Sequence, residues 1–188
     1  MTMKTRVLLI ILVIGVIPVL FISSCSKLKE LTSIDVSYKI PRQTFVYVPT
    51  SFKSGEQLLY SGFVEANLDS ILSANGLSSG VVGTTTFTKC TVTIDQPDSV
   101  TFSWLQSARG EISQNADFTP AQEVGYVVNS DPNAKTVNLT LNNTNIRPYL
   151  GSKTFYFRIF GVLNGPVPGN WVQMYVDGVL QMHLEPLN

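Results

Sequence analysis

The chain has 188 residues, of which 13 are basic and 13 acidic, so its formal net charge at pH 7 is zero. A chain without a charge excess or a basic stripe argues against a nucleic-acid partner and against a polybasic patch for membrane lipids. Only 14% of the residues are charged, so uncharged polar residues must cover much of the surface.

The first residues contain an apolar segment, residues 7–22, that follows two basic residues and runs into Ser23-Ser24-Cys25. A positive start, an apolar stretch and small residues at its end are typical of a secretory signal peptide. A transmembrane helix is the alternative, but it needs about 20 apolar residues. Pro18 would also remove a helical hydrogen bond and kink such a helix. We therefore expect a signal peptide over residues 1–24.

The end of this segment, Ile22-Ser23-Ser24-Cys25, resembles the lipobox of bacterial lipoproteins. The resemblance implies that Cys25 becomes the lipid-modified first residue of the mature protein. More than one acyl chain gives stable anchoring, so the mature chain would be tethered to a membrane without spanning it. Residues 25–32 are expected to form the lipidated tether. Residues 33–188 are long enough for one domain with its own core.

Cys90 is the other cysteine of the chain, and if Cys25 carries lipid, no intrachain disulfide can form. Cys90 alternates with polar residues and shares its parity with Val92 and Ile94. This pattern predicts a strand in which the thiol is a small buried hydrophobe rather than a reactive group.

Strands are predicted wherever apolar and polar residues alternate. The segments with this pattern are residues 34–40, 45–48, 88–94, 100–104, 123–128, 135–141, 155–159 and 172–184. Pro41 is expected to end the first of them or to place it at a sheet edge. Turns are expected at residues 96–98 and 129–133, whereas residues 51–62 give no clear pattern.

A single short helix is expected near residues 67–75, with Asn67 as its N-cap and Asn75-Gly76 as its stop. Seven to nine strands without alternating helices predict an all-β fold. The expected architecture is an antiparallel β-sandwich, either immunoglobulin-like or jelly-roll-like.

The last segment allows two interpretations. Asp177-Gly178 is a typical two-residue hairpin turn. A hairpin there, however, would move Val172 and Met174 onto the face of polar residues, whereas an unbroken strand keeps the aliphatic residues on one side. We favour one long strand, bulged at the glycine.

Several stretches resemble small lipoproteins of Bacteroidetes-type bacteria, which have a lipobox signal peptide and one β-sandwich domain. The matching pieces are residues 68–72, 75–77, 92–98 and 145–150. The resemblance implies a shared fold and compartment but no activity. In these bacteria, Asp-Ser before an aliphatic residue resembles an O-glycosylation acceptor, which makes Ser70 and Ser99 candidate modification sites. A helix's first turn and a tight turn would explain the same two dipeptides without any modification.

The residues give little sign of catalysis. His183 is the only histidine, and no cluster of cysteine, histidine and carboxylate accompanies it, so neither a metal site nor a catalytic triad is predicted. The 13 acids are scattered and do not form the facing pair that glycoside hydrolysis needs. We expect no enzyme and no cofactor, apart from the covalent lipid on Cys25.

Binding is better supported by the sequence. Trp171, Gln173, Tyr175 and Asp177 share the polar parity of the last strand. Two rings four residues apart in a strand lie about 13 Å from each other, a suitable span for stacking on consecutive sugars. These four residues are therefore a candidate ligand-binding face. The alternative is that the rings are covered by residues 51–62 or by the sandwich edge.

Two functions remain as expectations. The first is a structural or interaction module, an accessory subunit of a cell-envelope complex. The second is a surface lipoprotein that binds a glycan or a small ligand. Ser26 stands where some bacteria use aspartate for inner-membrane retention, which favours the outer membrane. Which side of that membrane the protein faces stays open.

Overall fold

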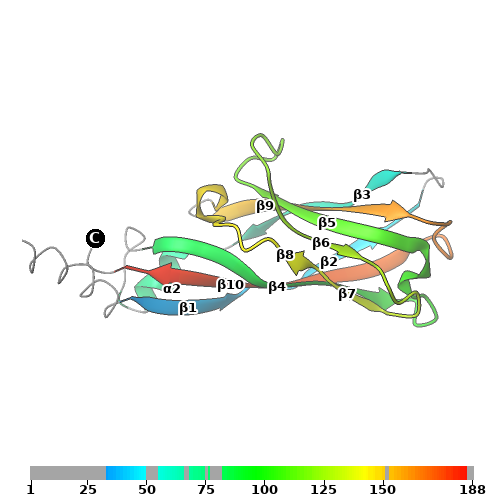
Figure 1. The fold of residues 1–188 in the computed structure, drawn as a ribbon, viewed down its shortest axis with the longest axis horizontal. Helices are drawn as coiled ribbons and strands as arrows, with labels where there is room; N and C mark the ends of the chain where they lie inside the picture. The colour runs from blue at the N-terminus through cyan, green and yellow to red at the C-terminus, as the bar shows by residue number, and fades with distance from the viewer. Residues whose placement is uncertain are drawn as a thin grey trace, which may run out of the picture.

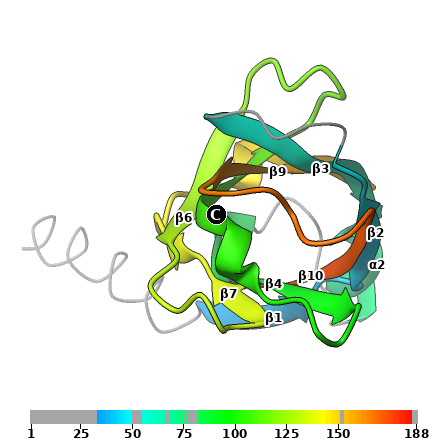
Figure 2. The ribbon, with the colours of Figure 1, turned by 90° about the vertical axis from the view of Figure 1, so that its right-hand side faces the viewer.

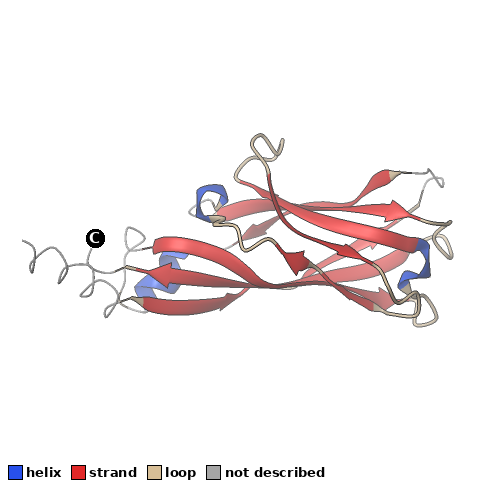
Figure 3. Cartoon of the chain, viewed as in Figure 1, coloured by secondary structure: helices blue, strands red, loops and turns tan. Residues whose placement is uncertain are grey.

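The computed structural model describes residues 33–49, 55–65, 68–74, 76, 82–150 and 153–185. The predicted signal peptide, Cys25, the tether over residues 25–32, Asn67 and Asn75 lie outside these residues. The described part contains ten strands, one α-helix and two 3-10 helices (Figures 1 and 3). They are β1 (Ile34–Lys39), β2 (Gln43–Tyr47), β3 (Glu56–Glu65), α2 (Leu68–Ala74), β4 (Val82–Gln96), η2 (Phe102–Trp104), β5 (Leu105–Ser113), β6 (Gln122–Val128), β7 (Thr136–Asn138), β8 (Thr140–Leu141), η3 (Arg147–Tyr149), β9 (Thr154–Leu163) and β10 (Val172–Leu184).

The strands form two antiparallel sheets that face each other, as the end-on view shows (Figure 2). In the first sheet the order is β1-β10-β4-β7, and β2 also pairs with β10. In the second sheet the order is β3-β9-β5-β6-β8. The predicted all-β antiparallel sandwich is confirmed, and α2 is the expected short helix. None of the helices in the described ranges is long and apolar enough to cross a membrane.

The long strand β10 organises the first sheet. It pairs with β1 and β2 along one side and with β4 along the other. Every second residue from Val172 to Leu184 is buried, and the residues between them are half-buried. The prediction of one unbroken strand is therefore confirmed, and there is no hairpin at Asp177-Gly178. The irregularity nearest to Gly178 lies one residue later, between Val179 and Leu180.

Gly178 provides a test of this strand. Its φ lies outside the left-handed region, and an added Cβ would come within 3.0 Å of Ile40 Cδ1, the movable end of a side chain. We therefore expect Gly178→Ala to change the free energy of unfolding by less than about 1 kcal/mol. A hairpin turn here would need a positive φ, at which alanine costs about 1–2 kcal/mol in backbone strain alone. Urea unfolding measures the difference, and a loss well above 2 kcal/mol would contradict the continuous strand.

The first two strands form one interrupted edge along β10. β1 pairs with residues 179–184, and β2 pairs with residues 172–176 of the same strand. Between them the Ile40 N–H donates to the Gly178 carbonyl at 3.0 Å. Pro41 follows, and it has no N–H to offer to a ladder. The prediction that Pro41 ends a strand at a sheet edge is thus confirmed.

The predicted strand over residues 100–104 is wrong. Phe102–Trp104 is a 3-10 helix, and the chain crosses here from β4 in the first sheet to β5 in the second. Val100, Phe102 and Trp104 are all buried, so their alternation reflects packing between the sheets and not a ladder. The Phe102 N–H donates to the Ala134 carbonyl in the loop before β7.

The predicted strand over residues 135–141 is divided between the two sheets. β7 pairs with β4, and β8 pairs with β6. Leu139 lies buried between them, and its N–H donates to the Cys90 carbonyl. Such a change of sheet is a common way to close one side of a sandwich. This division, together with β3 and β5 in stretches that the pattern did not assign, raises the strand number above the expected seven to nine.

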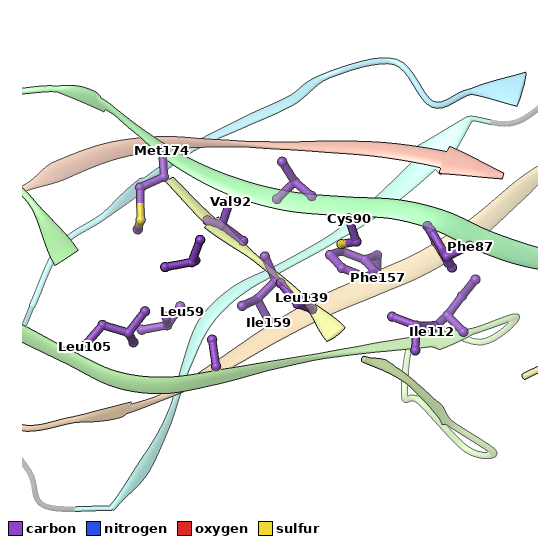
Figure 4. Packing of buried hydrophobic residues seen from close by; sticks show 14 of the residues in the cluster. Leu59, Phe87, Cys90, Val92, Leu105, Ile112, Leu139, Phe157, Ile159 and Met174 are labelled. Atoms are coloured by element: carbon purple, nitrogen blue, oxygen red, sulfur yellow. The ribbon is translucent and has the colours of Figure 1, made fainter. Parts of the chain in front are cut away.

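The inner faces of both sheets fill the space between them (Figure 4). The side chains shown include Phe87, Cys90, Val92, Leu105, Ile112, Phe157, Ile159 and Met174. One cavity among them has a volume of about 10 Å³, enough for about a single water molecule. The interior beside Cys90 is therefore packed, which leaves the outer faces and the sheet edges as the places where a ligand could bind.

Candidate functional site

The predicted ligand-binding residues lie at and after the start of β10. Trp171 immediately precedes the strand and is 44% exposed. Gln173, Tyr175 and Asp177 follow on the outward face, each half-buried. The shared parity of the four residues is confirmed by this arrangement. Their role in binding a ligand stays a prediction.

Arg42 contacts two of these four residues. Its guanidinium carbon lies 3.8 Å from the centroid of the Tyr175 ring. The same group donates to both carboxylate oxygens of Asp177, at 3.0 Å from Nε and 2.9 Å from Nη2. One face of the Tyr175 ring is therefore occupied by Arg42, so Trp171 is the ring with the larger free surface.

Trp171 belongs to an apolar surface at this end of the sheet. The β2–β10 register places Val46 opposite Gln173 and Tyr47 opposite Val172. Val48 and Trp171 are the residues that adjoin this last pair, and both valines are more than half exposed. We call Val46, Val48 and Trp171 the Trp171 surface. Gln173 borders it and donates to Asp95 at 2.7 Å.

The second sheet carries a charged network on its outer face that the sequence analysis did not identify. Arg109 on β5 donates to both carboxylate oxygens of Glu56 on β3, each at 2.7 Å. Arg109 also pairs with Glu111, which in turn accepts from Arg158 on β9 at 2.7 Å. Both guanidinium groups lie over the ring of Phe160, at 4.3 Å and 4.9 Å. We call Glu56, Arg109, Glu111 and Arg158 the Arg109 network.

The Arg109 network should contribute measurably to stability. We expect Arg109→Ala to lower the free energy of unfolding by about 1–2 kcal/mol, because it breaks the bidentate pair with Glu56 and leaves the half-buried Glu111 carboxylate with fewer donors. Lys135→Ala is the matched control, since its partner Asp98 is 89% exposed, and should cost less than about 0.5 kcal/mol. Urea unfolding of both variants tests this, and equal losses would contradict it.

The network also predicts a pH dependence. The hydrogen bonds from Arg109 lower the pKa of Glu56 below its ordinary value of 4.5. A carboxylate with a lower pKa in the folded state stabilises the fold above the unfolded pKa, and this stability is lost as the pH falls through the folded pKa. We expect stability to decline below about pH 4.5, and Glu56→Gln to remove part of that decline. Unfolding curves from about pH 3 to about pH 7 measure it. Superimposable pH profiles would exclude this role for Glu56.

The two candidate glycosylation sites are placed differently. Ser70 is exposed in the first turns of α2, and Ser99 is exposed in the turn after β4. Neighbouring Asp98 pairs with Lys135 at 3.2 Å. Modification at either serine stays a prediction.

Cys90 lies in the core, and His183 lies beside an acidic side chain. Cys90 is buried, as predicted, and burial raises the pKa of its thiol to about 12, so the thiol is protonated at neutral pH. His183 Nδ1 lies 2.8 Å from Asp35 Oδ1 on the neighbouring edge strand. Within the part of the chain that the structure describes, no three histidine, cysteine or acidic residues are grouped so that they could hold a metal ion.

A further feature missed from the sequence is a groove between the edges of the two sheets. It has a volume of about 480 Å³ and lies between the Pro41 interruption of the first sheet and β3 of the second. Its lining is Pro41, Gln43, Tyr60, Ser61, Gly62, Phe63 and Glu65. No sequence pattern signals it, because its two walls come from different sheets.

No protein-family model matches the sequence, and a search of curated proteins gives no match. Among solved structures, the chain is similar to a desmodium yellow mottle tymovirus structure at 13% identity and a TM-score of 0.30, covering 83% of this chain and 90% of that one. A structure of infectious bursal disease virus, Gx strain, matches at 10% identity and a TM-score of 0.41, covering 82% of this chain and 33% of that one. A structure of the Macrobrachium rosenbergii nodavirus particle matches at 14% identity and a TM-score of 0.32, covering 84% of this chain and 85% of that one. Likeness at this level supports no conclusion about function.

Proposed function

We propose that this protein is a lipid-anchored lipoprotein of the cell envelope, in which a β-sandwich acts as an interaction module and not as an enzyme. The observation that carries the proposal is the sequence Ile22-Ser23-Ser24-Cys25 at the end of an apolar segment. Lipid on Cys25 would hold the chain at a membrane through a short tether. The outer membrane is the proposed location, as in the Bacteroidetes-type lipoproteins that the sequence resembles.

The strand order supports a simple orientation. β1 begins opposite the end of β10, because Ile34 pairs with Leu184 (Figure 1). A tether that precedes residue 33 therefore joins the domain at that end. Val172 lies at the other end of β10, twelve residues away, which corresponds to about 40 Å of strand. The Trp171 surface would then point away from the membrane, where a partner in the envelope could reach it.

The main proposal is an accessory subunit that docks onto an envelope complex. A second candidate, binding of a glycan or small ligand, is favoured by one observation, the exposed ring of Trp171 beside polar Gln173. Exposed aromatic rings with neighbouring hydrogen-bonding groups bind sugars by stacking. No catalytic residue, cofactor or nucleic-acid partner is part of either proposal.

Fractionation of cells tests the lipid anchor. We expect the native protein to sediment with membranes and to enter the detergent phase, and Cys25→Ser to lose both properties. Cys90→Ser is the matched control, because it removes the buried thiol, and it should fractionate like the native protein. A Cys25→Ser variant that stays with the membrane in the detergent phase would refute the anchor.

A glycan array tests the second candidate, with the mature protein as probe. Trp171→Ala should abolish retention if the Trp171 surface binds sugar. Tyr126→Ala removes an equally exposed aromatic ring from the second sheet and should leave retention unchanged. No retention of the native protein, or retention that Trp171→Ala leaves unchanged, would exclude this candidate.

A further inference from the structure

The four sheet edges of the sandwich differ in how they are protected. The first sheet ends on one side in β7, with three residues, and on the other in the β1–β2 edge, which Pro41 interrupts. The second sheet ends on one side in β8, with two residues. Its other edge is β3, ten residues long, with neither proline nor lysine. Short strands, proline, charged side chains and β-bulges are the usual means by which proteins prevent edge pairing. β3 has an irregularity between Leu58 and Tyr60 and a glutamate at each end, so the stretch from Tyr60 to Val64 has none of them.

One side of the β3 backbone has no partner strand among the described residues. Among the strands that the structure describes, β3 pairs with β9 alone, and the register is regular from Tyr60 to Glu65 after an irregularity between Leu58 and Tyr60. Apart from this ladder, no backbone hydrogen bond between described residues involves these six positions. A regular strand with a free side presents a row of N–H and C=O groups to which another strand can add.

The groove between the sheet edges runs along this free side of β3. Pro41 and Gln43 form one wall, and residues 60–63 with Glu65 form the other. An added Cβ on Gly62 would lie 2.1 Å from Tyr60 Oη, so the Tyr60 ring lies over the glycine. Phe63 is 55% exposed. The free backbone edge thus stands beside two aromatic side chains that an extended segment could cover.

The charge of the groove indicates the chemistry of the occupant. Glu65 is the one charged residue among the lining residues that the structure describes. It is exposed, and it makes no ion pair within the described part of the chain. Glu56, at the other end of β3, is already bound by Arg109. A segment with a lysine or arginine near Glu65 and an apolar residue near Phe63 would complement both positions.

A second copy of this chain is a poor candidate for the partner of β3. This step rests on the proposed function, because it assumes that each copy is held by a lipid anchor. Antiparallel pairing of β3 with itself, as a two-fold axis allows, reverses the long axis of the second molecule. The two tethers would then leave from opposite ends of the pair, separated by about the 40 Å length of β10 or more. With the long axis upright on the membrane, as proposed above, one tether would start about 40 Å from the surface, beyond the roughly 28 Å that residues 26–33 reach when fully extended.

We propose that the free edge of β3, residues Tyr60 to Glu65, binds an extended segment of a partner polypeptide by strand addition, with a basic residue of that segment against Glu65. The partner's backbone supplies the hydrogen bonds, and Phe63 and Glu65 select its side chains. This assigns a docking site to the interaction module, at the side of the sandwich rather than at the Trp171 surface.

Hydrogen exchange with a synthetic probe tests this site. The probe is a peptide of about eight residues that alternates valine and threonine and ends in one lysine. With the mature protein in detergent and the peptide at up to about 1 mM, we expect slower amide exchange in β3. A peptide with glutamate in place of lysine should bind at least about fivefold more weakly, and one with alternate backbone amides N-methylated should give no protection.

Variants of the protein sharpen the test. Glu65→Gln should remove the difference between the lysine and glutamate peptides, whereas Asp131→Asn, in the loop between β6 and β7, should preserve it. The proposal is overturned if the lysine peptide leaves β3 exchange unchanged, or if the N-methylated peptide protects equally well. A dimer in sedimentation experiments that Phe63→Lys dissociates would also overturn it, by making a second copy the occupant. Because the readout is protection of β3 itself, a failed lipid anchor would not imitate any of these results.

Discussion

Trp104→Ala should be the most damaging single substitution that these results identify, lowering the free energy of unfolding by about 3–5 kcal/mol. The Trp104 ring is 2% exposed at the point where the chain crosses between the sheets. It stacks on Tyr47 of the first sheet, with centroids 6.2 Å apart, and packs against Phe102 at 5.7 Å. Its removal would leave a cavity where the surroundings can collapse little. A domain is stable by about 5–15 kcal/mol in total, so the loss would be severe.

The chain provides a matched control in Trp171, its other tryptophan. Trp171 is 44% exposed and precedes β10, so Trp171→Ala should change stability by less than about 1 kcal/mol. Tryptophan fluorescence during urea unfolding measures both variants, each with the one remaining ring as reporter. Similar losses in the two variants would mean that residues 102–104 do not pack between the sheets as described.

Asn129→Ala should lower the free energy of unfolding by about 1–3 kcal/mol, although the residue lies in a loop. Its Nδ2 donates to the carbonyl groups of Phe102 at 2.8 Å and Leu105 at 3.0 Å. Both carbonyls belong to buried residues at the crossing, and the Phe102 carbonyl also accepts from the Leu105 N–H. Deleting the amide would remove one of the two donors to Phe102 and the side-chain donor to Leu105, and an unpaired buried carbonyl costs about 1–3 kcal/mol.

Two further substitutions isolate the role of the Asn129 amide. Asn129→Asp keeps the size of the side chain but offers only acceptors at neutral pH, so it should be at least as destabilising as Asn129→Ala. Asn133→Ala, in the same turn, should cost less than about 0.5 kcal/mol. Chemical denaturation of the three variants tests the series. A stable Asn129→Asp protein would show that the amide hydrogens are not needed at the crossing.

Regular alternation was sufficient to predict β10 and the burial of Cys90 in β4, each of which follows a single sheet. The thirteen residues of β10 alternate without a break, and a hairpin at Gly178 would have mixed apolar and polar faces. The position of Cys90 beside Val92 and Ile94 predicted its burial for the same reason. Local pattern determines such elements because every second side chain meets the same layer.

Local pattern was not sufficient where the chain passes between the sheets. Residues 100–104 and 135–141 alternate like strands, yet the first forms η2 and the second divides at Leu139. In both segments apolar side chains must fill the space between two layers. Burial alone therefore makes apolar residues recur at every second position, as they do in a strand. The backbone hydrogen bonds that distinguish these segments from strands join Phe102 to Ala134 and Leu139 to Cys90, which are distant in sequence.

The outer-face interactions could be predicted only in part. The parity of Trp171, Gln173, Tyr175 and Asp177 was readable from the sequence, but the contact of Arg42 with two of them was not. Arg42 and Asp177 are 135 positions apart, and their pairing depends on the β1–β2 edge following β10. The Arg109 network likewise joins three strands whose order in the sheet is not a property of any local stretch. Residue type indicated candidates, and only the topology shows which of them meet.

The proposed function depends most directly on the chemical state of Cys25. The decisive measurement is the intact mass of the native protein, followed by mass spectrometry of its N-terminal peptide. We predict a chain that begins at Cys25 and carries acyl groups on that residue. A native chain that begins at Met1, or one with an unmodified Cys25 thiol, would contradict the account.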